Sequence, residues 1–312
     1  MHKGNSLVYG GILLAIYAIM LFMVIYVPII GFISLFLLPL PFIFMTLKNG
    51  GKWGFFFLAA ASFLSIIVGS FMSVPVTITF GLVGIIMGYH LKYDKSKLQM
   101  FISSVLMFMV CLLINFVVAL QLFDINYIQQ STDMMETSFE QSASLLESLG
   151  QTQQSAQLMD TLRETFALFQ ILIPSVLVIS SLLFVGLVFL ACKPIINRVS
   201  QKKLTIAPVR DIQLPKSLLW YYLFIMVGSL FVQSEIGDFS YTVISNVLFI
   251  LQFFILLQGY SFVFFFSHAK GWSRAVPVMI TIFTALFALT PFVRILGIID
   301  LGFPLREKMA SK

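Results

Sequence analysis

Residues 4–47 read GNSLVYGGILLAIYAIMLFMVIYVPIIGFISLFLLPLPFIFMTL, and no charged side chain interrupts them. In a helix, about 20 apolar residues cross the ~30 Å hydrocarbon core of a membrane. The segment is therefore long enough for two crossings, and Pro28 with Gly31 marks the turn between them. We expect one span over residues 9–26 and a second over residues 29–47.

The same arithmetic predicts nine spans in all. Residues 53–91 hold two spans divided near Ser73 and Pro75, and five further uncharged runs hold one each: 98–123, 165–192, 217–234, 239–269 and 275–293. Hydrophobic residues make up 59% of the chain and charged residues 10%, against about 45–50% and about 25% in soluble domains. This composition excludes a water-soluble globule. The expected fold class is an all-α polytopic transmembrane bundle of about nine spans, with eight also possible, in a lipid bilayer.

Charge is sorted between the two sides of the predicted spans. With the N-terminus inside, the inner segments up to Arg274 collect fourteen basic residues against Asp94 and Asp211, while the outer segments collect nine acidic residues against Arg163. Basic residues are retained on the cytoplasmic side. The pattern predicts a multi-pass protein of the bacterial plasma membrane with a cytoplasmic N-terminus. The net charge of +6 then reflects topology, and no nucleic-acid partner is expected.

The spacing of the spans predicts three regions: a six-span bundle over residues 1–192, a basic cytoplasmic linker over 193–216, and a three-span C-terminal region over 217–312. An outer insert at residues 124–164 has apolar side chains at helical spacing on each side of Gly150. We expect an extracytoplasmic helical hairpin that either only links its spans or acts as a lid or docking element. Nine crossings place Arg294 and later basic residues outside, so the tail is expected in the interface.

Enzyme chemistry is not expected from this sequence. The chain has no phosphate-binding Gly-Lys loop, and His2, His90 and His268 are predicted near the cytoplasmic boundary, far apart in sequence. No charged side chain is expected in the middle of a span, which argues against an ion-coupled pump. Cys111 and Cys192 are predicted at different depths, so no disulfide is implied. We expect no catalytic residue, metal or cofactor.

Small residues recur at helical spacing in two predicted spans. One row contains Gly11, Ala15 and Ala18, and the other contains Gly81, Gly84 and Gly88. A helix face without bulk lets another backbone approach closely. For the second row we expect packing inside this chain. For the first row, packing inside the chain and contact with a partner helix both remain open.

Six amide side chains fall inside predicted spans: Asn115, Gln121, Gln170, Asn246, Gln252 and Gln258. In hydrocarbon each amide needs a hydrogen-bond partner, so these residues are expected to join helices. Gln121 and Gln170 flank the outer insert on adjoining spans. They are therefore also candidates for binding a ligand near the outer mouth.

The first half of the chain resembles the substrate-binding S components of energy-coupling factor vitamin transporters. The resemblance rests on GILLAIYA at residues 11–18, LPLP at 38–41 and KNGGKWG at 48–54. It implies six spans, a ligand beneath the outer loops, and docking of the first helix on a membrane coupling subunit that works with ATPases. Gly11 and Ala15 match the docking position.

Over its whole length the chain is similar to the YybS-like family of bacterial membrane proteins. The similarity includes the outer insert, the additional C-terminal spans and the ending LGIIDLGFPLR at residues 296–306. The leading hypothesis is an S-component-like subunit for uptake of a small organic solute, with separate energy-coupling partners. The alternative is a membrane scaffold, assembly or regulatory protein that does not transport.

Overall fold

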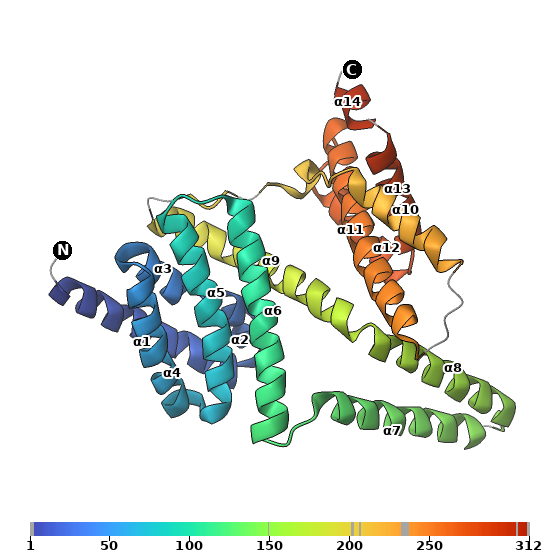
Figure 1. The fold of residues 1–312 in the computed structure, drawn as a ribbon, viewed down its shortest axis with the longest axis horizontal. Coiled ribbons are helices and arrows are strands. Elements are labelled where there is room, and N and C mark those ends of the chain that lie inside the picture. The colour runs from blue at the N-terminus through green and yellow to red at the C-terminus, as the bar shows by residue number, and fades with distance from the viewer. Residues whose placement is uncertain are drawn as a thin grey trace. The chain divides into compact units, whose positions relative to one another are not determined.

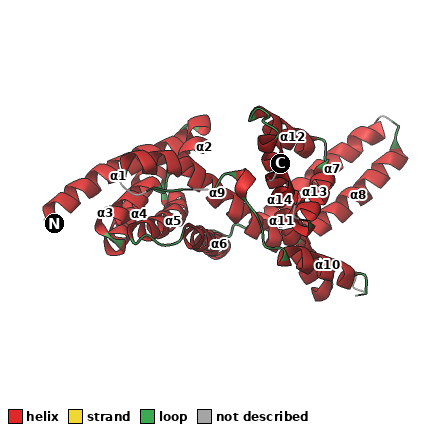
Figure 2. Cartoon of the chain, turned by 90° about the horizontal axis from the view of Figure 1, so that it is seen from above, coloured by secondary structure: helices red, strands yellow, loops and turns green. Residues whose placement is uncertain are grey.

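The computed structural model describes residues 3–310 apart from Leu149, Gln201, Lys202, Ile206, residues 232–236 and Pro304. Within these residues the regular elements are all helices and no strand occurs (Figure 1 and Figure 2). The predicted all-α fold class is confirmed. The chain forms two compact units, and each is described by itself: unit 1 contains residues 1–137 and 180–206, and unit 2 contains residues 138–179 and 207–312. The predicted division into membrane regions stays a prediction.

The helices follow the chain in the order labelled in Figure 1. Those of unit 1 are α1 (Lys3–Tyr26), α2 (Pro28–Leu37), α3 (Leu40–Asn49), α4 (Gly51–Gly69), η1 (Phe71–Ser73), α5 (Val74–Lys92) and α6 (Lys97–Leu122). Two helices belong partly to each unit, α7 (Tyr127–Ser148) and α9 (Ile173–Val199). Those of unit 2 are α8 (Thr152–Ile171), η2 (Val209–Asp211), α10 (Ser217–Ser229), α11 (Phe239–Ala269), α12 (Ala275–Leu286), α13 (Thr290–Gly302) and α14 (Leu305–Ala310).

Seven stretches of the described chain are long and apolar enough to cross a membrane. They are Ser6–Tyr26, Pro28–Asn49, Gly51–Gly69, Phe71–Lys92, Lys97–Leu122, Ile173–Val199 and Phe239–Ala269. Large apolar side chains on them are exposed, such as Ile29 at 82% and Phe56 at 73%, as expected where lipid is the solvent. The other two predicted spans contain the shorter apolar helices α10 and α12. The exact number of crossings stays a prediction.

Aromatic side chains fill the core of unit 1. Tyr17 of α1 is fully buried, its hydroxyl lies 2.6 Å from Thr77 Oγ1, and its ring meets the Phe42 ring edge-on at 5.2 Å. Phe184 of α9 stacks on Phe108 with ring centroids 5.1 Å apart. Lipid removes most of the hydrophobic drive between membrane helices, so such packing and hydrogen bonds hold them together.

The outer insert forms two helices that turn at the predicted place. Helix α7 ends at Ser148, α8 begins at Thr152, and Gly150 between them has φ +76°. Ala143 and Ser155 are buried near the turn, where Ser155 Oγ donates to the Ala143 carbonyl at 3.3 Å. Helix α8 continues to Ile171, beyond the predicted end of the hairpin at residue 164. The side of the membrane on which it lies stays a prediction.

The predicted span over residues 275–293 is divided in two. Helix α12 ends at Leu286 and α13 begins at Thr290, with Ala288 between them at φ +52°. At 1.5 Å per residue the two helices are about 18 and 20 Å long, each shorter than the ~30 Å hydrocarbon core. The expectation of one continuous helix here is wrong.

Candidate functional site

The two rows of small residues lie in opposite surroundings within unit 1. On α5, a Cβ atom added at Gly84 would lie 2.6 Å from the Pro39 carbonyl oxygen, and one added at Gly88 would lie 2.7 Å from the Ile43 carbonyl oxygen. A Cβ added at Gly81 would meet Leu58 and Phe42. Atoms of α3, of the preceding Pro39 and of α4 thus fill the space beside the α5 glycines.

On α1 the corresponding row faces outward. Gly11 and Ala15 are exposed and Ala18 is half-buried. Nothing in the structure lies within 4 Å of a Cβ built at Gly11. The buried face of α1 is a different one, formed by Leu13, Tyr17 and Leu21. Gly11 and Ala15 therefore present an open, narrow strip of helix backbone.

The predicted ligand amides are both exposed. Gln121 lies in the last turns of α6 in unit 1, and Gln170 lies at the end of α8 in unit 2. Other amides of the spans join helices: Asn115 Nδ2 donates to Thr79 Oγ1 at 2.9 Å, and Asn246 Oδ1 accepts from the backbone and hydroxyl of Ser175. A shared ligand site at Gln121 and Gln170 stays a prediction.

A buried ion pair in unit 2 was missed by the sequence reasoning. Arg306 Nη2 lies 2.6 Å from Asp300 Oδ2, and the two side chains are only 9% and 1% exposed. Gln258 Nε2 on α11 donates to the same carboxylate at 2.5 Å, and Arg306 Nη2 also donates to Ser261 Oγ at 3.1 Å. One signal in the sequence points to it, because Gln258 lies in an apolar helix and needs a hydrogen-bond partner. The sequence predicts Asp300 and Arg306 in an interfacial tail, whereas the structure buries both side chains.

Close backbone packing accompanies this ion pair. A Cβ at Gly259 of α11 would collide with the Val293 carbonyl oxygen, and one at Gly297 of α13 would collide with the Ile255 carbonyl oxygen. Further along the same seam, Arg294 Nη1 donates to Gln252 Oε1 at 2.7 Å. Glycines thus let α13 lie directly against α11, and polar pairs flank the contact.

The same polar groups hold the linker in unit 2. Arg306 Nη1 donates to the Arg210 carbonyl at 2.8 Å, Ser261 Oγ donates to the Ile212 carbonyl at 2.7 Å, and Leu214 N donates to Gln258 Oε1 at 2.9 Å. The linker residues 210–214 and the charged end of the chain near Arg306 are therefore in contact.

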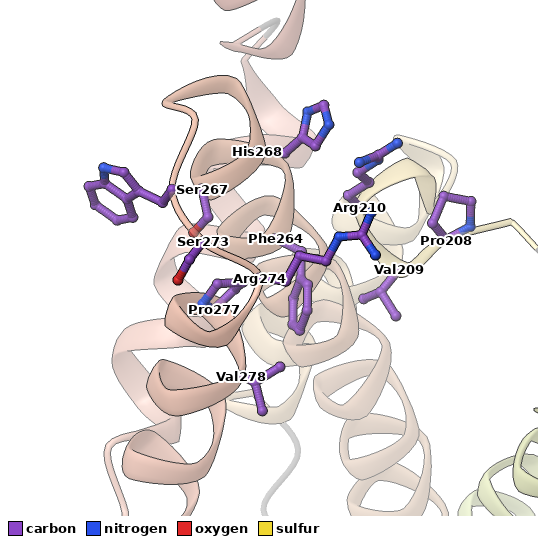
Figure 3. A pocket seen from close by; sticks show the side chains of 11 residues that line it. Pro208, Val209, Arg210, Phe264, Ser267, His268, Ser273, Arg274, Pro277 and Val278 are labelled. Carbon is purple, nitrogen blue, oxygen red and sulfur yellow. The ribbon is translucent and has the colours of Figure 1, made fainter.

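A cavity of about 440 Å³ opens beside this anchored linker (Figure 3). Its walls come from the linker, the end of α11, the following turn and the start of α12. They consist of Pro208, Val209, Arg210, Phe264, Ser267, His268, Trp272, Ser273, Arg274, Pro277 and Val278. The described residues contain no group of three or more His, Cys, Asp or Glu that could hold a metal ion. His2 lies outside the described residues.

A family model and a curated relative both match nearly the whole chain. Residues 15–301 match the family described as "Predicted membrane protein (DUF2232)". The chain is also 34% identical to "Uncharacterized protein YybS" of Bacillus subtilis (strain 168), in an alignment that covers 99% of this chain and 100% of that protein. No solved structure matches the chain significantly.

Proposed function

The chain belongs to the DUF2232 family of predicted membrane proteins, and we propose that it works by holding a transmembrane helix of another membrane protein against α1. It is then a scaffold or assembly subunit. The observation that carries this proposal is the open strip at Gly11 and Ala15, where no neighbouring helix of the described residues lies within 4 Å of a Cβ at Gly11.

The glycines of α5 in unit 1 indicate why the strip on α1 favours a protein partner over lipid. Small residues bring no advantage against fluid lipid chains, but they allow a second helix to approach closely enough for backbone contact. Helix α5 uses Gly84 and Gly88 in this way against α3. By the same geometry, an occupant of the α1 strip would be a helix whose backbone lies close to Gly11 and Ala15.

The resemblance to S components supports the same surface, because their first helix docks on the membrane coupling subunit. Such a subunit with its ATPases is one form of the proposed partner. Uptake of a solute is the second half of that resemblance and depends on Gln121 and Gln170. These residues are exposed, and neither of them lines the cavity of unit 2. Partner docking therefore has the stronger geometric support.

Photocrosslinking in cells tests the proposal. A photoreactive amino acid replaces Ile12, which is 57% exposed beside the strip, and the matched control replaces Ile67 on α4, which is 70% exposed. We expect a discrete protein adduct from position 12 and only lipid adducts from position 67. Adding Gly11→Leu should abolish the adduct at position 12.

Three results would argue against a heterologous partner. Adducts of equal intensity from both positions would mean that the contact is nonspecific. An adduct of twice the 35.2 kDa chain would mean that a second copy occupies the strip. Persistence of the adduct in Gly11→Leu would show that the small residues are not what the partner recognises, with Ala60→Leu on α4 as the control for added bulk.

A further inference from the structure

The cavity of unit 2 combines two kinds of surface. Arg210 comes from the linker and Arg274 from the turn before α12, and Figure 3 shows both reaching into the same region. Phe264 of α11 and Val278 of α12 provide apolar walls deeper along the helices. At about 440 Å³ the cavity has the size of a small-molecule site. Its occupant should therefore be partly anionic and partly apolar.

The positive charge of the cavity lining is only partly neutralised. Arg210 Nε lies 3.5 Å from Asp211 Oδ1, but both side chains are about half exposed, and Asp211 is not part of the lining. The Arg274 side chain makes no hydrogen bond or ion pair within the described residues, and His268 is exposed in the lining. No acidic residue lines the cavity. Arginine guanidinium groups bind phosphate through paired N–H donors.

A buried hydroxyl in the lining also lacks a partner. Ser267 is 2% exposed, and its Oγ has no hydrogen-bond partner within the described chain. Buried hydroxyls normally find a partner, so an unsatisfied one indicates a missing ligand or water. The first residues of α12 add the positive end of a helix dipole to the same cavity.

The position of the cavity identifies the source of the anion. It lies where the apolar helix α11 ends at Ala269 and Lys270 begins a charged turn, at the end that the charge distribution predicts to be cytoplasmic. Exposed Trp272 stands there as a typical interfacial side chain. Basic pockets between helices at this level bind lipid head groups. We propose that the cavity binds an anionic phospholipid, with its phosphate at Arg210 and Arg274 and its first acyl segment against Phe264 and Val278.

The ion pair described above gives this site a fixed wall. Arg306 holds the Arg210 carbonyl at 2.8 Å, and Asp300 neutralises Arg306. The backbone of Arg210 is thereby anchored, while its guanidinium makes only the half-exposed ion pair with Asp211. Arg306 thus has a structural role, so substituting it would disturb the fold and would not test ligand binding alone.

Native mass spectrometry of the full-length protein in mild detergent tests the proposal, with short-chain phosphatidylglycerol and phosphatidylcholine as probes. We expect specific binding of phosphatidylglycerol, and a loss of about 10- to 100-fold in affinity in the double variant Arg210→Gln/Arg274→Gln. Lys270→Gln, which removes a neighbouring charge outside the lining, is the matched control and should bind like the wild type. Thermal stability measured on the same samples verifies folding.

Three outcomes would overturn the proposal. Equal binding of the two lipids would remove the role of charge. Unchanged phosphatidylglycerol binding in the folded double variant would place the lipid elsewhere. Competition by glycerol 3-phosphate at the same concentration as the lipid would show that a free phosphate compound is the ligand. A double variant that does not fold is replaced by Arg274→Gln alone, for which about tenfold weaker binding is expected and unchanged binding contradicts the site.

Discussion

Helices α1 and α5 carry nearly the same spacing of small residues and use it in opposite ways. The α5 row of Gly81, Gly84 and Gly88 is covered by α3 and α4, whereas Gly11 and Ala15 on α1 are exposed. In α5 the small residues are part of the fold. In α1 Gly11 has no packing counterpart among the described residues, and we propose that its row serves recognition of a partner.

The seam between α11 and α13 is a third case. Gly259 and Gly297 allow close contact as the glycines of α5 do, but buried polar side chains also hold this seam. The two internal seams are alike if the glycines contribute most of the stability of the α11–α13 contact. They differ if the buried polar groups contribute most of it.

The largest effect is expected from Asp300→Ala, which leaves Arg306 buried without its counter-ion. Breaking a buried pair from one side costs about 3–5 kcal/mol of unfolding free energy. Reversible unfolding in mixed micelles measures this loss. The matched control, Asp211→Ala, removes an exposed partner of Arg210 and should change stability by less than about 1 kcal/mol. Equal effects of both variants would show that the buried pair is not a special feature of this seam.

Gly84→Ala should destabilise unit 1 by about 2 kcal/mol. The new methyl group would lie 2.6 Å from the Pro39 carbonyl oxygen and 2.7 Å from Phe42 Cβ, so helices must separate to admit it. The same substitution at Gly186 of α9 meets nothing within 4 Å and serves as the control. Thermal unfolding of the two variants compares them, and a Gly84→Ala protein as stable as Gly186→Ala would mean that the α5 seam is loose.

Asn246→Ala should cost about 1–2 kcal/mol. Asn246 Oδ1 accepts from Ser175 N at 2.9 Å, and its Nδ2 donates to the Ile171 carbonyl at 2.8 Å, so both backbone groups lose their side-chain partner. Ser245→Ala, at the neighbouring half-buried position, is the control. Unfolding in the same micelles should show the loss for Asn246→Ala alone. An equal loss in both variants would indicate a packing effect and not the amide.

Local signals in the sequence predict several helix ends, but not the break between α2 and α3 inside the expected span 29–47, nor the start of α9 at Ile173 inside the expected span 165–192. Pro28 begins α2, Lys92 ends α5, Lys97 begins α6, and the hairpin turns beside Gly150. The turn between α12 and α13 has a weaker signal. Pro291 lies in the first turn of α13, but the uncharged run over residues 275–293 is typical of one span, and Ala288 adopts a positive φ that alanine rarely takes.

Pairings between distant residues were also beyond the sequence. The sequence predicts that Gln258 needs a hydrogen-bond partner, but nothing local points to Asp300, which lies 42 positions later. The two rows of small residues were both recognised, yet their surroundings differ because tertiary packing decides which row is covered. The candidate site of unit 2 depends on such packing, since the linker, α11 and α12 each contribute only part of it.

The smallest effect has the opposite sign. Gly11→Ala should raise the free energy of unfolding by about 0.5–1 kcal/mol, because alanine favours the helix over the unfolded chain, and no other helix of the described residues lies within 4 Å of the new methyl group. The measurement is the same unfolding experiment used for Gly84→Ala, so one chemical change is compared at two positions. A rise at Gly11 beside a fall at Gly84 would establish that α1 is open and α5 is closed. A fall at both positions would mean that a neighbour already packs on the α1 strip in the purified protein, and size-exclusion chromatography with light scattering would then reveal a second copy. Because the methyl group is small, a partner helix should still dock on Gly11→Ala, whereas Gly11→Leu should exclude it.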